Sequence, residues 1–136
     1  MEKCLKSFQL TGYDIIVVDT GSTDGTKEMV AKYTPYLYDF EWVNDFSAAR
    51  NFAISKVKSE YIIMADSDET LKGWDKKVFE RRLKEHPKGL GSIRKENLLD
   101  EEGTDYTISN EPRVFSKNCY HYEGSIHEQV VRSLLR

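Results

Sequence analysis

The chain has 136 residues, of which 39% are hydrophobic and 12% aromatic, so it can form one domain with a real core. A net charge of −3 does not support nucleic-acid binding. No apolar run approaches the ~18 residues of a membrane-spanning helix, and the first residues lack the long apolar stretch of a signal peptide. The only cysteines, Cys4 and Cys119, fit no zinc spacing. They favour a reducing cytosolic compartment, with one long-range disulfide as the alternative.

Strand and helix patterns alternate through the first part of the chain. Residues 15–18 form an uninterrupted β-branched run, which is typical of a strand buried on both faces of a parallel sheet. A polar loop follows, and then a helix is predicted over residues 27–33, before Pro35. Residues 36–42 alternate with period two and predict a second strand.

The same alternation continues to Gly89. Ser47 is a candidate N-cap for a helix that extends to about residue 57. Residues 61–65 predict a third buried strand, and residues 74–85 predict a third helix. This order of elements is typical of the α/β class with a mainly parallel sheet flanked by helices.

In the last third of the chain the pattern changes from alternating strands and helices to strands alone. Residues 92–98 and 106–108 flank an acidic turn that contains glycine, which predicts a hairpin, and residues 113–115 predict one more short strand. We therefore expect a single domain with an α/β part over residues 1–89 and a small β-rich addition over residues 90–136.

Two polar clusters directly follow buried strands, at residues 19–24 and 66–69. Ligands of open α/β sheets collect beyond the carboxyl ends of strands. Asp66 and Asp68 would repel each other there unless a cation joined them, and hard oxygen ligands favour Mg²⁺ or Mn²⁺ shared with a substrate phosphate. The alternative is a solvated acidic loop that caps the next helix. The first cluster lacks the Gly-Lys-Ser/Thr of a Walker A loop, and its alternative is a loop with a good N-cap.

Four motifs, spread over roughly residues 4–130, point to one family. They are residues 14–26 (DIIVVDTGSTDGT), 44–53 (NDFSAARNFA), 61–69 (YIIMADSDE), and in the tail 113–115 with 122–129 (RVF and YEGSIHEQ). In this order they closely resemble family 2 glycosyltransferases, which have the Rossmann-like GT-A fold of nucleotide-diphospho-sugar transferases. The bacterial branch of lipopolysaccharide-core and peptide glycosyltransferases is the most similar.

The resemblance implies an inverting, metal-dependent transfer of a sugar from a nucleotide sugar, commonly a UDP-sugar, to an acceptor hydroxyl. The acceptor would be a saccharide, a lipid-linked molecule or a peptide, as in cell-envelope polysaccharide biosynthesis. No nucleic-acid partner is expected. The implied location is cytoplasmic, with a peripheral position at the inner membrane face.

The resemblance also implies roles for individual residues. Donor binding would involve five of them: Asp19, Ser22, Asp24, Arg50 and Asp66. Within this set, Asp19 would lie near the base or ribose, Arg50 near the diphosphate, and Asp66 near the ribose and sugar. The metal, Mn²⁺ or Mg²⁺, would be held by Asp68 and His127. The alternatives are an exposed helical charge for Arg50 and an ordinary strand-end side chain for His127.

The acceptor hydroxyl must lose a proton, which requires a positioned carboxylate. Family members commonly supply it from an acidic pair in the last third, and this chain has no Glu-Asp pair there. Glu128 is the first candidate for the base, followed by Glu123 and Glu111.

The chain also departs from the family pattern at its ends. Residues 1–8 match the helix that follows the first family strand, so we expect the first strand and the C-terminal part of the family to be missing. A sheet without that strand would expose an edge, which predicts a homo-oligomer formed through it. Two other functions stay open: an impaired remnant that at most binds nucleotide or sugar, and a Mg²⁺-dependent phosphohydrolase or nucleotidyltransferase.

Overall fold

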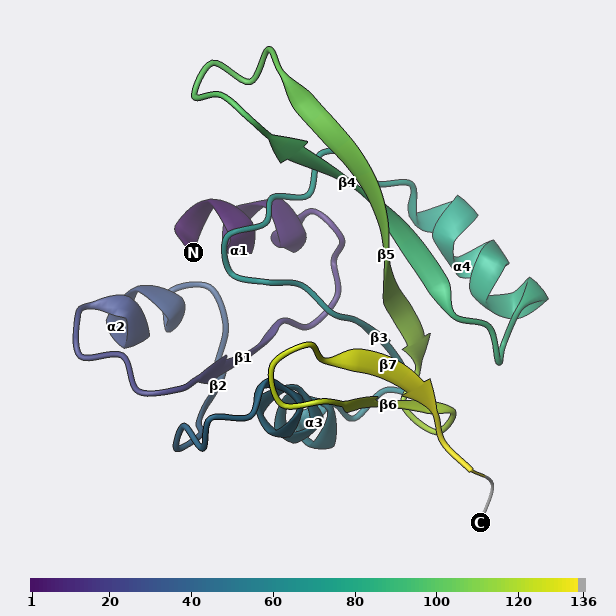
Figure 1. Ribbon diagram of the computed structural model, residues 1–136, viewed down its shortest axis with the longest axis horizontal. Helices are drawn as coiled ribbons and strands as arrows, with labels where there is room; N and C mark the ends of the chain where they lie inside the picture. Colours follow the sequence, from purple (N-terminus) through teal and green to yellow (C-terminus); the bar gives the residue numbers. More distant parts are fainter. Residues whose placement is uncertain (135–136) are drawn as a thin grey trace.

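The computed structural model describes residues 1–134, in which helices and short strands alternate before a β-rich final third (Figure 1). In chain order the elements are α1 (Glu2–Gln9), β1 (Ile16–Asp19), α2 (Thr26–Val30), β2 (Tyr36–Asp39), α3 (Phe46–Lys56), β3 (Tyr61–Ile63), α4 (Lys76–Glu85), β4 (Gly91–Leu98), β5 (Tyr106–Ser116), β6 (Tyr120–Glu123) and β7 (Gln129–Arg132). The alternation of helix and strand expected before Gly89 is therefore present, with elements slightly shorter than predicted.

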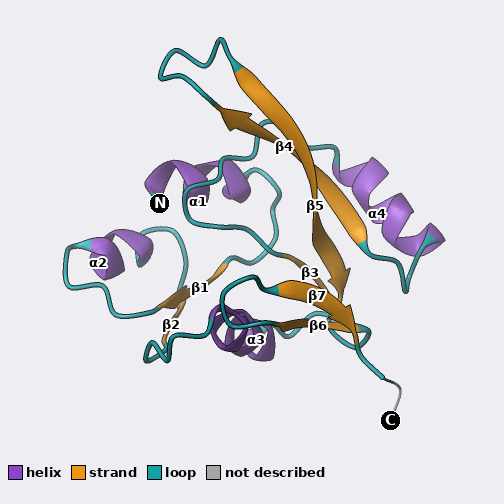
Figure 2. Ribbon diagram, viewed as in Figure 1, coloured by secondary structure: helices purple, strands orange, loops and turns teal. Residues whose placement is uncertain are grey.

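The described strands form three small sheets rather than one (Figure 2). β1 pairs with β2 in parallel, whereas β3–β5–β4 and β6–β7 are antiparallel. The chain is thus α/β in its elements, but the expected mainly parallel sheet is not confirmed. The reason is that β4 and β5 form a hairpin, whose short connection over residues 99–105 makes the pair antiparallel, and the end of β5 then pairs with β3.

Two local predictions need correction. Helix α3 is capped by Asp45, whose Oδ1 accepts a hydrogen bond from the Ala48 N–H at 3.1 Å. The predicted cap, Ser47, lies inside the helix, is buried and donates instead to the Gly124 carbonyl. The predicted strand at residues 113–115 is the end of the long β5 and not a separate element.

The core joins the third strand to the last part of the chain. Ile62 of β3, Phe115 of β5 and Tyr122 of β6 are buried together. Partly buried side chains pack against them: Ile54, Val57, Met64, Tyr120 and Val130. Because α3, β3, β5 and β6 all contribute, this core fixes the position of the polar residues that follow β3.

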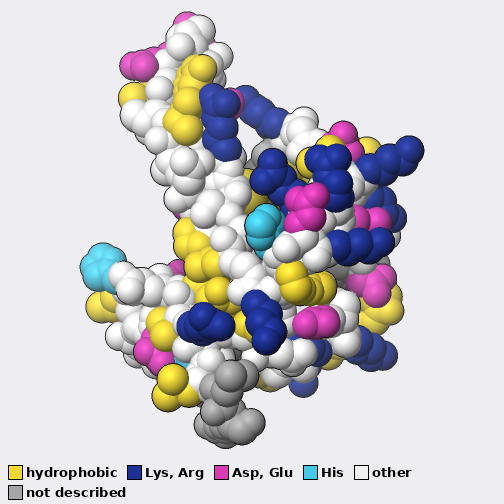
Figure 3. Space-filling model, turned by 90° about the vertical axis from the view of Figure 1, so that its right-hand side faces the viewer, with side chains coloured by type: hydrophobic (Ala, Val, Ile, Leu, Met, Phe, Trp, Pro, Cys, Tyr) yellow, Lys and Arg dark blue, Asp and Glu magenta, His cyan; other side chains and the backbone are white. Residues whose placement is uncertain are grey.

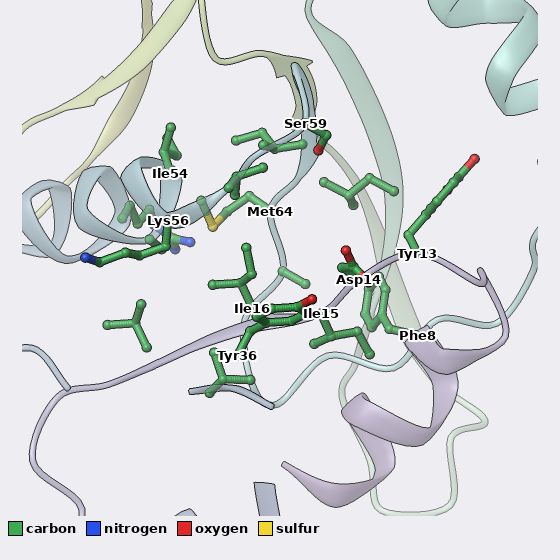
Figure 4. A pocket seen from close by; sticks show the side chains of 18 of the residues that line it. Phe8, Tyr13, Asp14, Ile15, Ile16, Tyr36, Ile54, Lys56, Ser59 and Met64 are labelled. Carbon is green, nitrogen blue, oxygen red and sulfur yellow. The ribbon is translucent and has the colours of Figure 1, made fainter. Parts of the chain in front are cut away.

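A large cavity separates β1 from β3, and its volume is about 810 Å³ (Figure 4). Ile16 from β1, Met64 from the end of β3 and Ile54 from α3 line it, with Phe8 from α1 on another side. Neither strand has a hydrogen-bonded neighbour on the side toward the other, because β1 pairs only with β2 and β3 only with β5 among the described strands. Both strands thus keep one unpaired edge.

Neither cysteine forms a disulfide: Cys4 is buried and Cys119 half-buried, and both are free thiols. Over residues 1–134, no helix has the length and apolar character needed to cross a lipid bilayer.

Candidate functional site

Residues of the two polar clusters, which follow β1 and β3, line one pocket. The pocket has a volume of about 590 Å³, with Thr20 after β1 and Asp66 and Asp68 after β3 among its lining residues. Arg50 and Asp66 also line the larger cavity between β1 and β3, so the two spaces adjoin at these side chains. The carboxyl ends of both strands therefore face a continuous hollow.

Asp66 is held by two arginines. Its Oδ1 accepts from Arg50 Nη2 at 2.8 Å, and its Oδ2 accepts from Arg113 Nη2 at 3.1 Å. Burial alone would raise the pKa of Asp66, but the hydrogen bond from Arg113 and the charges of both arginines outweigh it, so the pKa lies below its ordinary value. Asp66 is therefore a carboxylate at neutral pH, with both oxygens occupied.

Arg113 is the most heavily paired of these groups. Its side chain is only 10% exposed, and its Nη2 donates to Glu111 at 2.6 Å and to Glu69 at 2.9 Å as well as to Asp66. Burial lowers the pKa of Arg113, and the surrounding carboxylates more than offset this, so it stays charged. Glu69 in turn accepts from the Asp66 backbone N–H at 2.8 Å. We refer to these interlocked charges as the arginine cluster; its members are Arg50, Asp66, Glu69, Glu111 and Arg113.

Asp68 differs from Asp66 in every respect that matters for a ligand. Its side chain is exposed at the pocket, and within residues 1–134 no hydrogen bond or ion pair engages its carboxylate. In that same part of the chain, no three His, Cys, Asp or Glu side chains gather closely enough to hold a metal ion by themselves. Mg²⁺ in nucleotide enzymes uses one or two carboxylates plus phosphates and waters, so a single uncommitted carboxylate fits that ion.

The loop after β1 is organised by Asp19. This side chain is buried, and its Oδ2 accepts from the N–H groups of Gly21 at 3.2 Å and Ser22 at 2.9 Å. Burial raises the pKa of Asp19 and these hydrogen bonds lower it more, giving a net decrease. Asp19 and Ser22 line the larger cavity. Asp24 does not: it is exposed and bonds Thr26 at the start of α2.

The two tail residues proposed from sequence lie differently. Glu128 lines the pocket, and its Oε1 meets Arg50 Nη2 at 2.9 Å and Arg50 Nε at 3.0 Å. His127 is exposed and does not line the pocket, although both of its neighbours, Ile126 and Glu128, do. The structure thus brings Glu128 to Arg50 and Asp66, and leaves His127 outside this group.

The other two candidate bases are each engaged elsewhere. Glu111 belongs to the arginine cluster and also meets Lys95 Nζ at 3.5 Å. Glu123 is exposed on β6 and lies 2.8 Å from His121 Nε2. Neither lines the pocket, so Glu128 is the candidate base nearest to the clustered strand ends.

Sequence reasoning missed Arg113 and the apolar side of the pocket. Arg113 enters the sequence analysis only as part of the RVF motif, and the one signal there is an arginine placed directly before the apolar pair Val114-Phe115. The apolar lining comes from Trp42, Phe46 and Ile126. Trp42 and Phe46 lie close together in the sequence but Ile126 is far from both, so no local pattern groups the three.

Comparisons with known proteins point to one family. Residues 1–126 match the family described as glycosyl transferase family 2. The chain is 29% identical over 140 aligned positions to the SPbeta prophage-derived glycosyltransferase SunS of Bacillus subtilis, covering 95% of this chain and 31% of that protein.

Two further relatives match over about half of the chain. A TPR repeat-containing protein of Synechococcus elongatus is 38% identical over 71 residues, which is 52% of this chain and 18% of the relative. The lipopolysaccharide core biosynthesis glycosyltransferase LpsC of Rhizobium meliloti is 30% identical over 73 residues, or 51% of this chain and 27% of the relative. The chain thus spans between about a fifth and a third of the length of these curated relatives.

Proposed function

The chain belongs to glycosyl transferase family 2, and from this premise we propose that it transfers a sugar from a nucleotide-sugar donor, a UDP-sugar, to an acceptor hydroxyl, with inversion and with a divalent metal. The observation that carries the proposal is the pocket where Thr20, Arg50 and Asp68 meet beyond the ends of β1 and β3. The family match favours this chemistry over a phosphohydrolase or nucleotidyltransferase.

The nucleotide end of the donor belongs on the side of β1. Asp19 fixes the loop through its two backbone hydrogen bonds, so the loop is ordered before a ligand arrives. Ser22 lines the same cavity and offers a hydroxyl to the ribose or base. Arg50 lies where the two hollows adjoin, and its guanidinium is the planar, always-charged group that suits a diphosphate. Asp24 contributes indirectly, by accepting hydrogen bonds from Thr26 at the start of α2.

Asp68 would hold the divalent metal, Mn²⁺ or Mg²⁺. The bound metal supplies Lewis-acid stabilisation of the negative charge on the departing diphosphate. His127 would need to turn toward the pocket to take part. Asp66 has a different role, because it is held by two arginines: it orients Arg50 toward the donor from a position beside the ribose and sugar.

Glu128 is our candidate for the base. Arg50 engages only its Oε1, and within the described residues Oε2 has no protein partner. The contact with Arg50 fixes the carboxylate while Oε2 stays available to accept the proton of an acceptor hydroxyl. On this proposal residues 1–89 bind the donor and residues 90–136 face the acceptor, which is a saccharide, a lipid-linked molecule or a peptide.

A cytoplasmic position at the inner membrane face fits the charge of α4. Basic side chains gather on the face that carries this helix, with a few acidic ones between them (Figure 3). Those of the helix and the residues just after it are all exposed: Lys76, Lys77, Arg81, Arg82, Lys84 and Lys88. A cluster of this size attracts anionic lipids. Co-sedimentation with phosphatidylglycerol vesicles, and none with phosphatidylcholine vesicles, is the expected result.

The unpaired edges of β1 and β3 are the place we propose for pairing with a second copy. Light scattering over a range of concentrations tests this directly. A monomer at every concentration would overturn it.

The donor site is tested by calorimetric titration of UDP with and without Mn²⁺. The parent should bind in a metal-dependent way, and Asp68→Asn should lose that dependence. Asp105→Asn is the matched control, because it makes the same change at an exposed position on the β4–β5 turn. If UDP binds equally well to Asp68→Asn with Mn²⁺ present, Asp68 does not hold the metal.

A domain that binds the donor without turnover is the second candidate. The observation that favours it is that Arg50 already joins Asp66 to Glu128, so two of the proposed reacting groups start in ion pairs. Release of free sugar and UDP from a UDP-sugar decides between them: turnover supports transfer, and binding alone supports the second candidate.

A further inference from the structure

Three exposed apolar side chains share the pocket with Asp68. Trp42 is 38% exposed, Phe46 47% and Ile126 68%, and all three line the same hollow as Arg50 and Asp68. Single exposed apolar residues are common on protein surfaces, but a group of them beside polar ligand-binding groups is typical of a binding site.

The group is also held in place before any ligand arrives. The rings of Trp42 and Phe46 pack edge to face with centroids 4.9 Å apart. Trp42 Nε1 donates to Asn44 Oδ1 at 3.1 Å, and Asn44 has a φ of 57°, the one positive φ outside glycine within residues 1–134. Such a backbone conformation costs free energy and is concentrated at functional sites.

Ile126, the third side chain of the group, is held beside Phe46 by a backbone hydrogen bond. The Phe46 N–H, at the start of α3, donates to the Ser125 carbonyl at 2.9 Å. Ser125 precedes Ile126 in the β6–β7 loop, so this bond fixes the loop against the helix. Residues 42–46 and the loop that carries Ile126, two segments far apart in the chain, are thereby brought to one surface.

We propose that Trp42, Phe46 and Ile126 form a stacking platform for the pyranose ring of the donor sugar. The inference rests on the proposed function. If the nucleoside lies in the cavity beside β1 and the diphosphate lies at Arg50, the sugar beyond the diphosphate enters the adjoining pocket.

The chemistry of a pyranose suits this pocket. One face of the ring presents C–H groups, which are attracted to the electron-rich face of an aromatic side chain. Its hydroxyls need hydrogen-bond acceptors at the edge, and the carboxylates of Asp68 and Glu128 line the same space. UDP alone, which lacks the transferred pyranose, would not contact the platform.

The test compares the dissociation constants of UDP with those of UDP-glucose, UDP-galactose and UDP-N-acetylglucosamine, all with Mn²⁺. Trp42→Ala should weaken the tightest-binding UDP-sugar by about tenfold, on the scale of stacking contacts in other sites, and leave UDP within about twofold. Trp42→Phe should keep most of the affinity. Tyr106→Ala removes an aromatic side chain of similar exposure on β5, 46% against 38% for Trp42, and is the control.

Each failure has a distinct signature. If Trp42→Ala weakens UDP and UDP-sugars equally, or weakens neither, the platform is overturned and the proposed function stands. If UDP itself does not bind to the folded parent, the proposed function fails and the inference fails with it.

Discussion

The arginine cluster lies beside the rim of the pocket, by which we mean Asp68 and the stacking platform. The charged side chains of the cluster are paired with one another, whereas the side chains of the rim are open to a ligand. In the cluster every carboxylate has a cation partner, and Arg113 alone contacts three of them. At the rim, Asp68 is unpaired within the described residues and the stacking platform is exposed. Asp66 and Asp68 are two residues apart, so the fold gives the two carboxylates of one short motif different roles. Asp66 organises its surroundings, and Asp68 is available to a ligand.

The largest effect on this difference should come from removing Arg113, the residue at the centre of the arginine cluster. Arg113→Ala would leave three carboxylates close together without their shared cation. We expect a loss of about 2–4 kcal/mol in the free energy of unfolding, somewhat below the usual cost of breaking a buried pair because Asp66 is about a third exposed. Urea denaturation measures it. Arg132→Ala, at an exposed position on β7, should change stability by less than about 0.5 kcal/mol.

The next effect compares the two aspartates directly. Asp66→Asn should lower the free energy of unfolding by about 1–3 kcal/mol, because it leaves Arg50 and Arg113 with a weaker partner. Asp68→Asn should leave it unchanged within about 0.5 kcal/mol. Urea denaturation of both variants measures these changes. Equal losses of unfolding free energy in the two variants would show that Asp66 and Asp68 do not have different roles.

Removing the N-cap of α3 should have a smaller effect, but on both the arginine cluster and the stacking platform. Asp45 caps α3, which supplies Arg50 to the cluster and Phe46 to the platform. Asp45→Ala should cost about 1 kcal/mol of stability. It should also loosen both side chains, so UDP affinity should fall in calorimetry. Asp45→Asn, which can still accept the hydrogen bond, should restore most of both losses.

The smallest effect is the dependence on pH. The pKa of Asp66 in the folded chain lies below its ordinary value of 3.8, so its contribution is complete well above pH 3.8 and is lost as the pH falls through the folded pKa. Between pH 6 and pH 4 the stability advantage of the parent over Asp66→Asn should shrink by roughly a few tenths of a kcal/mol. Most of the loss should come below pH 4. An advantage that grows on acidification would contradict the ion pairs.

Local patterns in the sequence predicted the elements well and their pairing poorly. The β-branched run over residues 15–18 and the period-two segment after Pro35 are strands because each pattern acts within its own few residues. Only β1 and β2 pair in parallel, and the expected mainly parallel sheet is not confirmed, since the partner of β3 is β5, about 50 residues further along the chain. The β6–β7 hairpin was not predicted either, although Gly124 with a φ of 101° marks its turn.

In the candidate site, too, local features could be predicted from the sequence and contacts between distant segments could not. The position of Asp66 directly after β3 could be predicted from the strand pattern. Its contact with Arg50 of α3, and the contact of Arg50 with Glu128 of the β6–β7 loop, depend on tertiary packing that no local pattern describes. The role of Arg113 arises only because Val114 pairs with Ile63, which brings the arginine beside the residues after β3. His127 shows the reverse: a motif can name a residue, while its orientation depends on a turn that the motif does not describe.

The cavity between β1 and β3 has a consequence for amide exchange. In a strand with one paired edge, successive N–H groups point alternately toward the neighbour and away from it. Along residues 16–19 one set of amides is bonded to β2, and the other set faces the cavity. Deuterium uptake should therefore alternate between slow and fast from residue to residue, and a strand that entered the cavity would slow the fast set alone.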